Sequence, residues 1–173
     1  SNIQKNAIKK KFFKSNILII GAAGSIGEKF SKDILNFNIK KIYFLDKNEN
    51  DLTELNRILN LARSRIEKEY ICYDILNLDL RKFILNNKIN HIINFSALKH
   101  VRSEENKYST EYMFAVNSIS FLNIKYPKSV KSIFSISTDK VNKPTSLLGV
   151  SKKLMEHTLS EIKNKNKNIF VST

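Results

Sequence analysis

Short apolar runs alternate with longer segments of helical periodicity from Asn16 onward. Runs with the length of strands, rich in β-branched and aromatic residues, occupy residues 17–20, 42–45, 91–95 and 132–136, and more weakly 70–73. Residues 169–171 begin a sixth run. Because the apolar positions are continuous rather than alternating, they indicate strands covered on both faces, as in a parallel sheet.

The segments between these runs each carry one apolar stripe. In residues 50–65, the apolar side chains recur at three- and four-residue steps, at Leu52, Leu55, Leu59 and Ala62. Similar stripes predict helices over residues 25–36, 78–86, 109–124 and 146–162. Strands that alternate with helices are typical of βαβ units. The sequence therefore predicts an α/β fold, a Rossmann-type doubly wound parallel sheet in a three-layer αβα arrangement.

The first fifteen residues differ from the rest. They contain a lysine cluster with Phe12 and Phe13 and show no clear period, so we expect a basic lead-in arm over residues 1–15. The whole chain has 173 residues, enough for one domain with a sizeable core, which we place over residues 16–173.

The amino-acid composition bears on whether the protein binds nucleic acid. Thirty Lys and Arg against sixteen Asp and Glu give a net charge of +14, and a basic surface is what nucleic-acid binding requires. Lysine, however, supplies 25 of the 30 basic residues and asparagine occurs 21 times, which indicates a coding bias toward these residues rather than selection for phosphate recognition. We therefore expect no nucleic-acid partner.

The sequence indicates neither a membrane-spanning segment nor a metal site. No apolar stretch approaches the roughly 20 residues of a membrane-spanning helix, and no signal sequence is evident, so we expect a cytoplasmic protein without a membrane partner. The single Cys72, which we place in the core, and three scattered His residues have no metal-ligand spacing.

The strongest chemical motif directly follows the first strand. Residues 21–27, GAAGSIG, open the first helix, where glycines let backbone amides approach a pyrophosphate that the helix N-terminus favours. Asp46 ends the second strand nineteen residues after Gly27, where a carboxylate accepts hydrogen bonds from a ribose. The two features together predict a dinucleotide site whose loop comprises Gly21, Ala23, Gly24, Ser25, Ile26 and Gly27.

The form of the dinucleotide stays open between NAD and NADP. The carboxylate of Asp46 favours NAD because it repels a 2′-phosphate, whereas the neighbouring Lys47 attracts one.

Two further motifs accompany the GxxGxxG spacing. SALKHV at residues 96–101 follows the fourth strand; STDK at residues 137–140 follows the fifth and precedes Asn142, Pro144 and LGVSK at residues 148–152. In this order and spacing they resemble the CapD-type polysaccharide biosynthesis proteins of the extended short-chain dehydrogenase/reductase superfamily. The resemblance covers residues 16–173.

The resemblance implies an NAD(P)-dependent enzyme that modifies a UDP-sugar. A UDP-N-acetylglucosamine 4,6-dehydratase oxidises the sugar at C4, removes water across C5 and C6, and reduces C6; the alternative 4-epimerase returns the hydride to C4. A binding module that keeps the dinucleotide site without turnover is a further alternative. Relatives also imply a homo-oligomer, and because they build the sugar site from segments after the sixth strand, we expect the sugar-binding part to be absent from this chain.

The resemblance also assigns residues. The superfamily's usual base is the Tyr of YxxxK, but here Leu148 occupies the Tyr position while Lys152 is present. Leucine transfers no proton, so acid–base chemistry at C5 and C6 is expected of Asp139 and Lys140, with Thr138 and Ser137 as a proton relay. Lys152 would hold the nicotinamide ribose. The remaining expected cofactor contacts are Asp74, Ile75, Ser96, Ala97, Lys99 and Asn117, and Lys99 and His100 are expected at the substrate.

Overall fold

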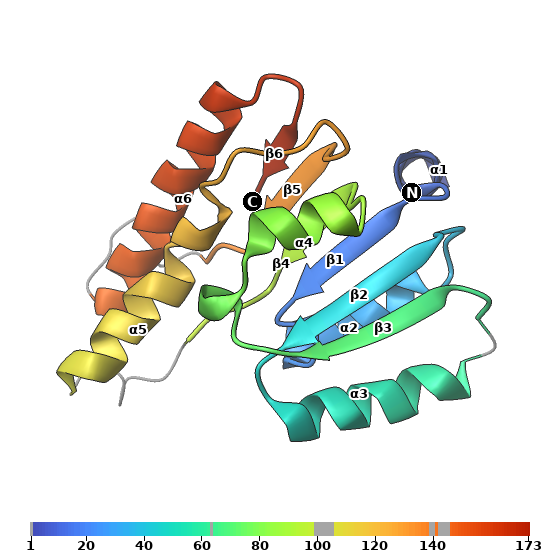
Figure 1. The fold of residues 1–173 in the computed structure, drawn as a ribbon, viewed down its shortest axis with the longest axis horizontal. Helices are drawn as coiled ribbons and strands as arrows, with labels where there is room; N and C mark the ends of the chain where they lie inside the picture. The colour runs from blue at the N-terminus through green and yellow to red at the C-terminus, as the bar shows by residue number, and fades with distance from the viewer. Residues whose placement is uncertain (1, 63, 99–105, 139–140, 142–145) are drawn as a thin grey trace.

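Six parallel strands form one sheet in the order β3-β2-β1-β4-β5-β6 (Figure 1). The computed structural model describes residues 2–62, 64–98, 106–138, 141 and 146–173. The strands are β1 (Asn16–Ile20), β2 (Lys41–Asp46), β3 (Glu67–Cys72), β4 (His91–Asn94), β5 (Ser132–Ser135) and β6 (Phe170–Ser172). The ends of all six lie within three residues of the predicted runs, and the weak run at 70–73 overlaps the edge strand β3, which ends at Cys72.

Helices cover both faces of the sheet (Figure 1). One face carries α2 (Ser25–Ile34) and α3 (Glu49–Leu61), and the other carries α4 (Leu80–Asn86), α5 (Lys107–Asn117) and α6 (Leu147–Lys165). Alternate residues of β1 supply the two cores: Ile17 and Ile19 face α2 and α3, while Leu18 and Ile20 face the other layer. The predicted doubly wound, three-layer fold is confirmed.

The segment predicted as one helix over 109–124 is two elements. The α5 helix ends at Asn117, Ile119 adopts the left-handed conformation with φ 53°, and a 3₁₀ turn follows over Ser120–Leu122. Ile119 and Leu122 are fully buried in the same core. The apolar period therefore continues across a break in the backbone, and the single-helix prediction was wrong.

Two other expectations differ from the structure. The segment expected as an arm contains the helix α1 (Asn2–Phe12), whose Phe12 ring packs edge-on against His91 with ring centroids 5.0 Å apart. Cys72, expected in the core, is exposed because it ends the edge strand β3. The short 3₁₀ turn Ile75–Asn77 follows this strand.

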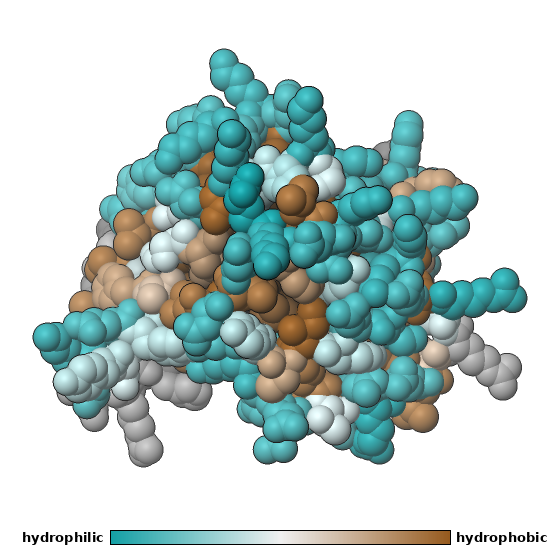
Figure 2. Space-filling view, viewed as in Figure 1, coloured by the Kyte–Doolittle hydropathy of each residue, from teal (hydrophilic) through white to brown (hydrophobic). Residues whose placement is uncertain are grey.

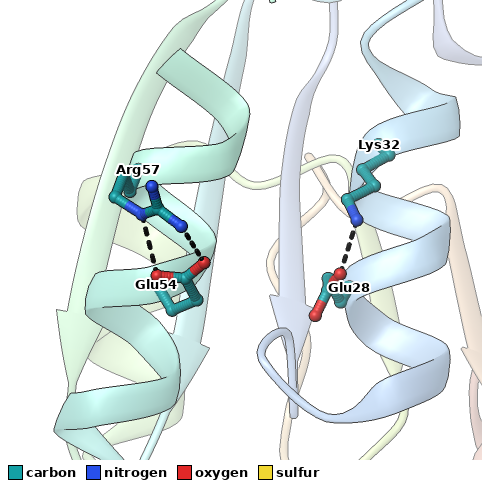
Figure 3. Close-up of polar contacts among 4 residues, drawn as sticks. All are labelled: Glu28, Lys32, Glu54 and Arg57. Atoms are coloured by element: carbon teal, nitrogen blue, oxygen red, sulfur yellow. Dashed lines mark hydrogen bonds and ion pairs between the residues drawn. The ribbon is translucent and has the colours of Figure 1, made fainter. Parts of the chain in front are cut away.

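Ion pairs on the helix surfaces add little to stability. On α2, the Lys32 ammonium lies 2.5 Å from a Glu28 carboxylate oxygen, and on α3 the Nε and Nη2 of Arg57 donate to Glu54 (Figure 3). Exposed pairs of this kind contribute no more than about 1 kcal/mol each. The fold is therefore stabilised chiefly by its two apolar cores.

An apolar strip remains exposed on α6. Leu147, Val150 and Leu154 recur at helical spacing and are 38–46% exposed, and Figure 2 shows apolar surface over the α5 and α6 side of the molecule. Such a strip is typical of a surface used for association, although the expected homo-oligomer stays a prediction. Within the described residues, no helix is long and apolar enough to span a membrane.

His91 makes stability depend on pH. It is 1% exposed, its Nδ1 lies 2.7 Å from the Ser132 hydroxyl, and burial, with smaller effects from Lys11 and Lys131, lowers the pKa of His91 to about 4. Between about pH 4 and pH 6.5, His91 therefore binds a proton in the unfolded chain and not in the folded one. Stability should fall by up to about 3 kcal/mol as the pH drops from 6.5 to 4.

Urea unfolding across this pH range checks the expectation. His91→Gln should remove this part of the pH dependence, whereas His157→Gln, at an exposed position on α6, should leave it unchanged. An identical pH dependence of stability in wild type and His91→Gln would show that His91 is not its source.

Candidate functional site

A cavity of about 460 Å³ opens at the carboxyl ends of β1, β2 and β4. The strand order reverses between β1 and β4, and ligands of open α/β sheets bind at such a switch point. The predicted cofactor residues that line it are Gly21, Gly24, Ser25, Ile26, Gly27, Asp46, Lys47, Asp74, Ile75, Ser96 and Ala97. The volume falls within the range of small-molecule sites.

Two of the three motif glycines are required by packing. Gly21 has φ 71°, and a Cβ there would lie 2.6 Å from the Ser96 amide nitrogen; a Cβ on Gly27 would lie 2.2 Å from the Gly21 carbonyl oxygen. Gly24 differs, because its Cβ would meet nothing closer than that same oxygen at 3.6 Å. The absence of side chains at Gly21 and Gly27 thus lets the loop pack tightly against the segment after β4 and the start of α2. Gly24 instead leaves space in the cavity wall.

The start of α2 provides an anion site. The first hydrogen bond within this helix runs from the Glu28 amide to the Gly24 carbonyl, at 2.7 Å. The amides of Ser25, Ile26 and Gly27 precede it and have no carbonyl of the helix to pair with. Amides at a helix N-terminus favour a diphosphate group, so this end of the cavity fits the pyrophosphate of a dinucleotide.

Asp46 is fixed at the edge of the cavity by two backbone amides. Its Oδ2 accepts a hydrogen bond from the Ala23 amide at 3.0 Å, and its Oδ1 accepts one from Asn48 at 3.1 Å. Each oxygen has a second lone pair for a ribose hydroxyl. Ala23 therefore orients Asp46 rather than lining the cavity.

Tyr112 of α5 is a cavity residue that the sequence analysis missed. Its hydroxyl donates to Asp74 Oδ2 at 2.5 Å, and the ammonium of Lys47 lies 4.7 Å from the centre of its ring. Burial and the hydrogen bond to Asp74 raise the pKa of Tyr112 well above its ordinary value, so the hydroxyl remains a donor. No motif in the sequence marks Tyr112; the structure shows that it lies one turn before Val116, which also lines the cavity.

Asn117 lies behind the cavity wall. Its fully buried amide accepts from the Leu98 amide at 2.8 Å and donates to the Leu98 carbonyl at 3.0 Å and to the Ser151 hydroxyl at 3.1 Å. These contacts join α5, α6 and the segment after β4. The structure therefore gives Asn117 a positioning role for that segment, and its contact with the cofactor stays a prediction.

Lys152 lies beneath the segment that follows β5. It is 4% exposed, and its Nζ donates to the Ile136 carbonyl at 3.2 Å. The nearby Ser137 hydroxyl donates to Glu156 of α6 at 2.8 Å, and the Thr138 carbonyl accepts from Val141 at 3.4 Å. The buried ammonium of Lys152 thus contacts the residue directly before the STDK segment, in which the catalytic residues are expected.

The other expected catalytic and substrate residues lie outside the described residues. These are Asp139, Lys140, Lys99 and His100. Among the residues that the structure does describe, no group of three His, Cys, Asp or Glu side chains could hold a metal ion.

Known proteins are similar to this chain in sequence and fold. The family model described as polysaccharide biosynthesis protein matches residues 17–173. An uncharacterized membrane protein of Methanocaldococcus jannaschii is 32% identical over 149 residues, covering 84% of this chain and 43% of its own length. The inverting UDP-N-acetylglucosamine 4,6-dehydratase of Campylobacter jejuni is 28% identical over 145 residues, covering 82% of this chain and 41% of its own.

A solved structure agrees with these relatives. The UDP-glucuronic acid 4-epimerase of Bacillus cereus, in complex with UDP-glucuronic acid and NAD, has a TM-score of 0.70 and 25% identity, and the match covers 90% of this chain and 54% of that one. The chain spans less than half the length of the two curated relatives. Because the family model covers nearly all of it, the chain belongs to the polysaccharide biosynthesis protein family.

Proposed function

We propose that this chain binds NAD(P) and provides the cofactor part of a nucleotide-sugar dehydratase. The observation that carries the proposal is the open space at Gly24 beside the amides that begin α2, with Asp46 fixed across the same cavity. Only a ligand with an anionic group near a hydroxyl-bearing one uses both features. The NAD-bound epimerase with the same fold supports this assignment. Asp46 makes NAD the proposed form.

The reaction that we propose begins at C4 of the sugar. When bound, the nicotinamide supplies a hydride acceptor and later returns the hydride. The buried ammonium of Lys152 would hold the cofactor ribose and stabilise negative charge that develops during C4 oxidation. As the hydride leaves C4, the C4 hydroxyl would lose its proton to solvent through Thr138 and Ser137. Asp139 would take the C5 proton and Lys140 would donate a proton to the departing C6 hydroxyl, so that water leaves. The hydride would then add to C6, and Asp139, its proton exchanged with solvent, would return a proton to C5; these roles rest on the STDK resemblance.

The dehydratase is favoured over the epimerase by the relatives and by the STDK segment. The Campylobacter relative is a UDP-N-acetylglucosamine 4,6-dehydratase, which supports UDP-N-acetylglucosamine as the substrate. The epimerase with the shared fold acts on UDP-glucuronic acid. Both reactions begin with removal of the C4 hydroxyl proton, so Leu148 does not distinguish them. The STDK segment does, because it offers a further acid and base, which elimination across C5 and C6 requires and inversion at C4 does not.

Incubation of the full-length protein with UDP-N-acetylglucosamine in heavy water tests the proposal. We expect loss of one water from the sugar and deuterium at C5, measured by mass spectrometry and NMR. Asp139→Asn should lower C5 exchange by about a hundredfold or more while NAD affinity stays unchanged. Exchange retained in this variant would remove Asp139 from the mechanism.

The remaining outcomes separate the alternatives. Inversion at C4 without loss of water would indicate the epimerase. NAD binding with no change in any UDP-N-acetylhexosamine would indicate the binding module.

A further inference from the structure

The edge of the sheet opposite the cofactor cavity is strongly basic. All strands are parallel, so α1 and the loops that precede the strands lie at this amino-terminal edge. In its described residues, 6–16, 35–41, 64–67, 86–91, 123–132 and 163–170, there are fourteen Lys or Arg and one acidic residue, Glu67, which begins β3. The other fifteen acidic residues lie elsewhere in the chain. A coding bias would raise the lysine content everywhere, so it does not explain this segregation.

Backbone hydrogen bonds hold these loops together as one surface. The Lys40 amide donates to Ser15 before β1, the Asn90 amide donates to Asn16, and the Lys131 amide donates to Asn90. The Phe170 amide then donates to Lys131. The loops therefore form a continuous row about 24 Å long, given six strands spaced about 4.8 Å apart. Hydrophilic side chains project along the upper and right-hand outline in Figure 2, the side where the strands begin in Figure 1.

Most of this charge is not neutralised within the described part of the chain. Lys41 pairs with Glu67 and Glu69 of β3, and Lys165 pairs with Glu161 of α6. Asp33 in the last turn of α2 borders the edge. Lysines 9, 10, 14, 40, 88 and 131 are exposed and belong to no ion pair among the described residues.

Apolar side chains are exposed among these lysines. Phe13 is 55% exposed, Phe170 is 59% exposed and Ile8 is 41% exposed. The ammonium of Lys11 lies 4.0 Å from the centre of the Phe170 ring, and that of Lys14 lies 5.4 Å from the centre of the Phe13 ring. Aromatic rings beside ammonium groups suit a boundary where anionic headgroups meet hydrocarbon.

We propose that this basic edge, formed by α1 and the loops before the strands, docks on the surface of an anionic lipid membrane. Anionic headgroups attract unpaired lysines, and the exposed rings enter the headgroup layer. Thirteen of the fourteen basic residues are lysines, whereas nucleic-acid recognition favours the bidentate geometry of arginine. The docked molecule keeps its cofactor cavity toward the solvent, because the cavity lies at the opposite ends of the strands.

Sedimentation with lipid vesicles tests this surface. The protein should bind vesicles containing about one third phosphatidylglycerol, bind pure phosphatidylcholine at least about tenfold more weakly, and dissociate at about 0.5 M salt. The triple variant Lys10→Glu, Lys40→Glu and Lys131→Glu should lose at least about tenfold in binding. A control with the same net charge carries Lys29→Glu, Lys82→Glu and Lys153→Glu on helices away from the edge and should keep most of the binding.

Other measurements make the outcomes decisive. Thermal unfolding of both triple variants establishes that they are folded, and Phe13→Ser alone, also checked for folding, should weaken vesicle binding several-fold without changing net charge. Equal losses in the two triple variants would overturn the proposal, because they would show attraction to overall charge. Tight binding to a DNA or RNA duplex with no binding to vesicles would also overturn it, in favour of a nucleic-acid surface.

Discussion

Gly27→Ala is expected to destabilise the protein severely. The added Cβ would lie 2.2 Å from the Gly21 carbonyl oxygen and 2.8 Å from that of Ala22. Both are backbone atoms of the loop that joins β1 to α2, so no side chain can rotate away. We expect a loss of at least about 3 kcal/mol, a large part of the stability of a single domain. Chemical denaturation measures it, and an unfolding midpoint equal to wild type would contradict the packing role of Gly27.

Gly24→Val, in the same loop, is expected to abolish cofactor binding and leave the fold intact. The Gly24 backbone is extended, with φ −66° and ψ 161°, and its Cβ would meet only an oxygen at 3.6 Å. The fold should therefore persist. The valine methyl groups would occupy the space beside the α2 amides, so titration should show NAD and NADP affinity reduced at least about a hundredfold. Unchanged affinity in a folded variant would exclude this loop as the dinucleotide site.

The sequence predicts the sheet and the glycine loop because both depend on local patterns. Continuous apolar runs are required by strands covered on two faces, and a strand, a glycine turn and a helix must follow one another for an anion to reach the helix N-terminus. The position of Asp46 follows for the same reason, since the end of a parallel strand lies at the cavity edge. These features do not depend on contacts between residues far apart in the sequence.

Features that depend on distant contacts were not predictable. Ile119 continues the apolar stripe of α5, so the pattern cannot distinguish a helix from a left-handed break that buries the same residues. The α1 helix has a mixed sequence, and its packing depends on Phe12 meeting His91 of β4. Cys72 is exposed only because β3 is an edge strand, which is a property of strand order rather than of its neighbours in sequence.

The same limit applies within the site. Tyr112 reaches Asp74 across 38 residues of sequence, and Asn117 uses its amide on Leu98 and Ser151. A motif comparison places Asn117 near the cofactor but cannot show that its donors and acceptor are already used by the protein. Tyr112 belongs to none of the motifs and becomes visible only when α5 packs beside the turn that follows β3.

Lys152→Met is expected to lower turnover of UDP-N-acetylglucosamine by about a thousandfold in the full-length protein, on the proposed function. Methionine matches the length and apolar stem of lysine and fits a buried site, 4% exposed, beside Met155. The loss therefore reports the missing ammonium rather than a cavity. Lys153→Met, at the exposed neighbouring position on α6, removes the same charge from the chain and should leave turnover within about twofold.

The split between kinetic constants identifies the role of Lys152. An ammonium that stabilises charge developing at C4 acts in the transition state, so Lys152→Met should lower kcat strongly and change KM for the sugar little. A residue that only holds the segment after β5 through the Ile136 carbonyl would instead disturb sugar binding and melting temperature together. Turnover near wild type in a folded Lys152→Met protein would remove the ammonium from the chemistry and leave Lys152 a structural contact between α6 and the end of β5.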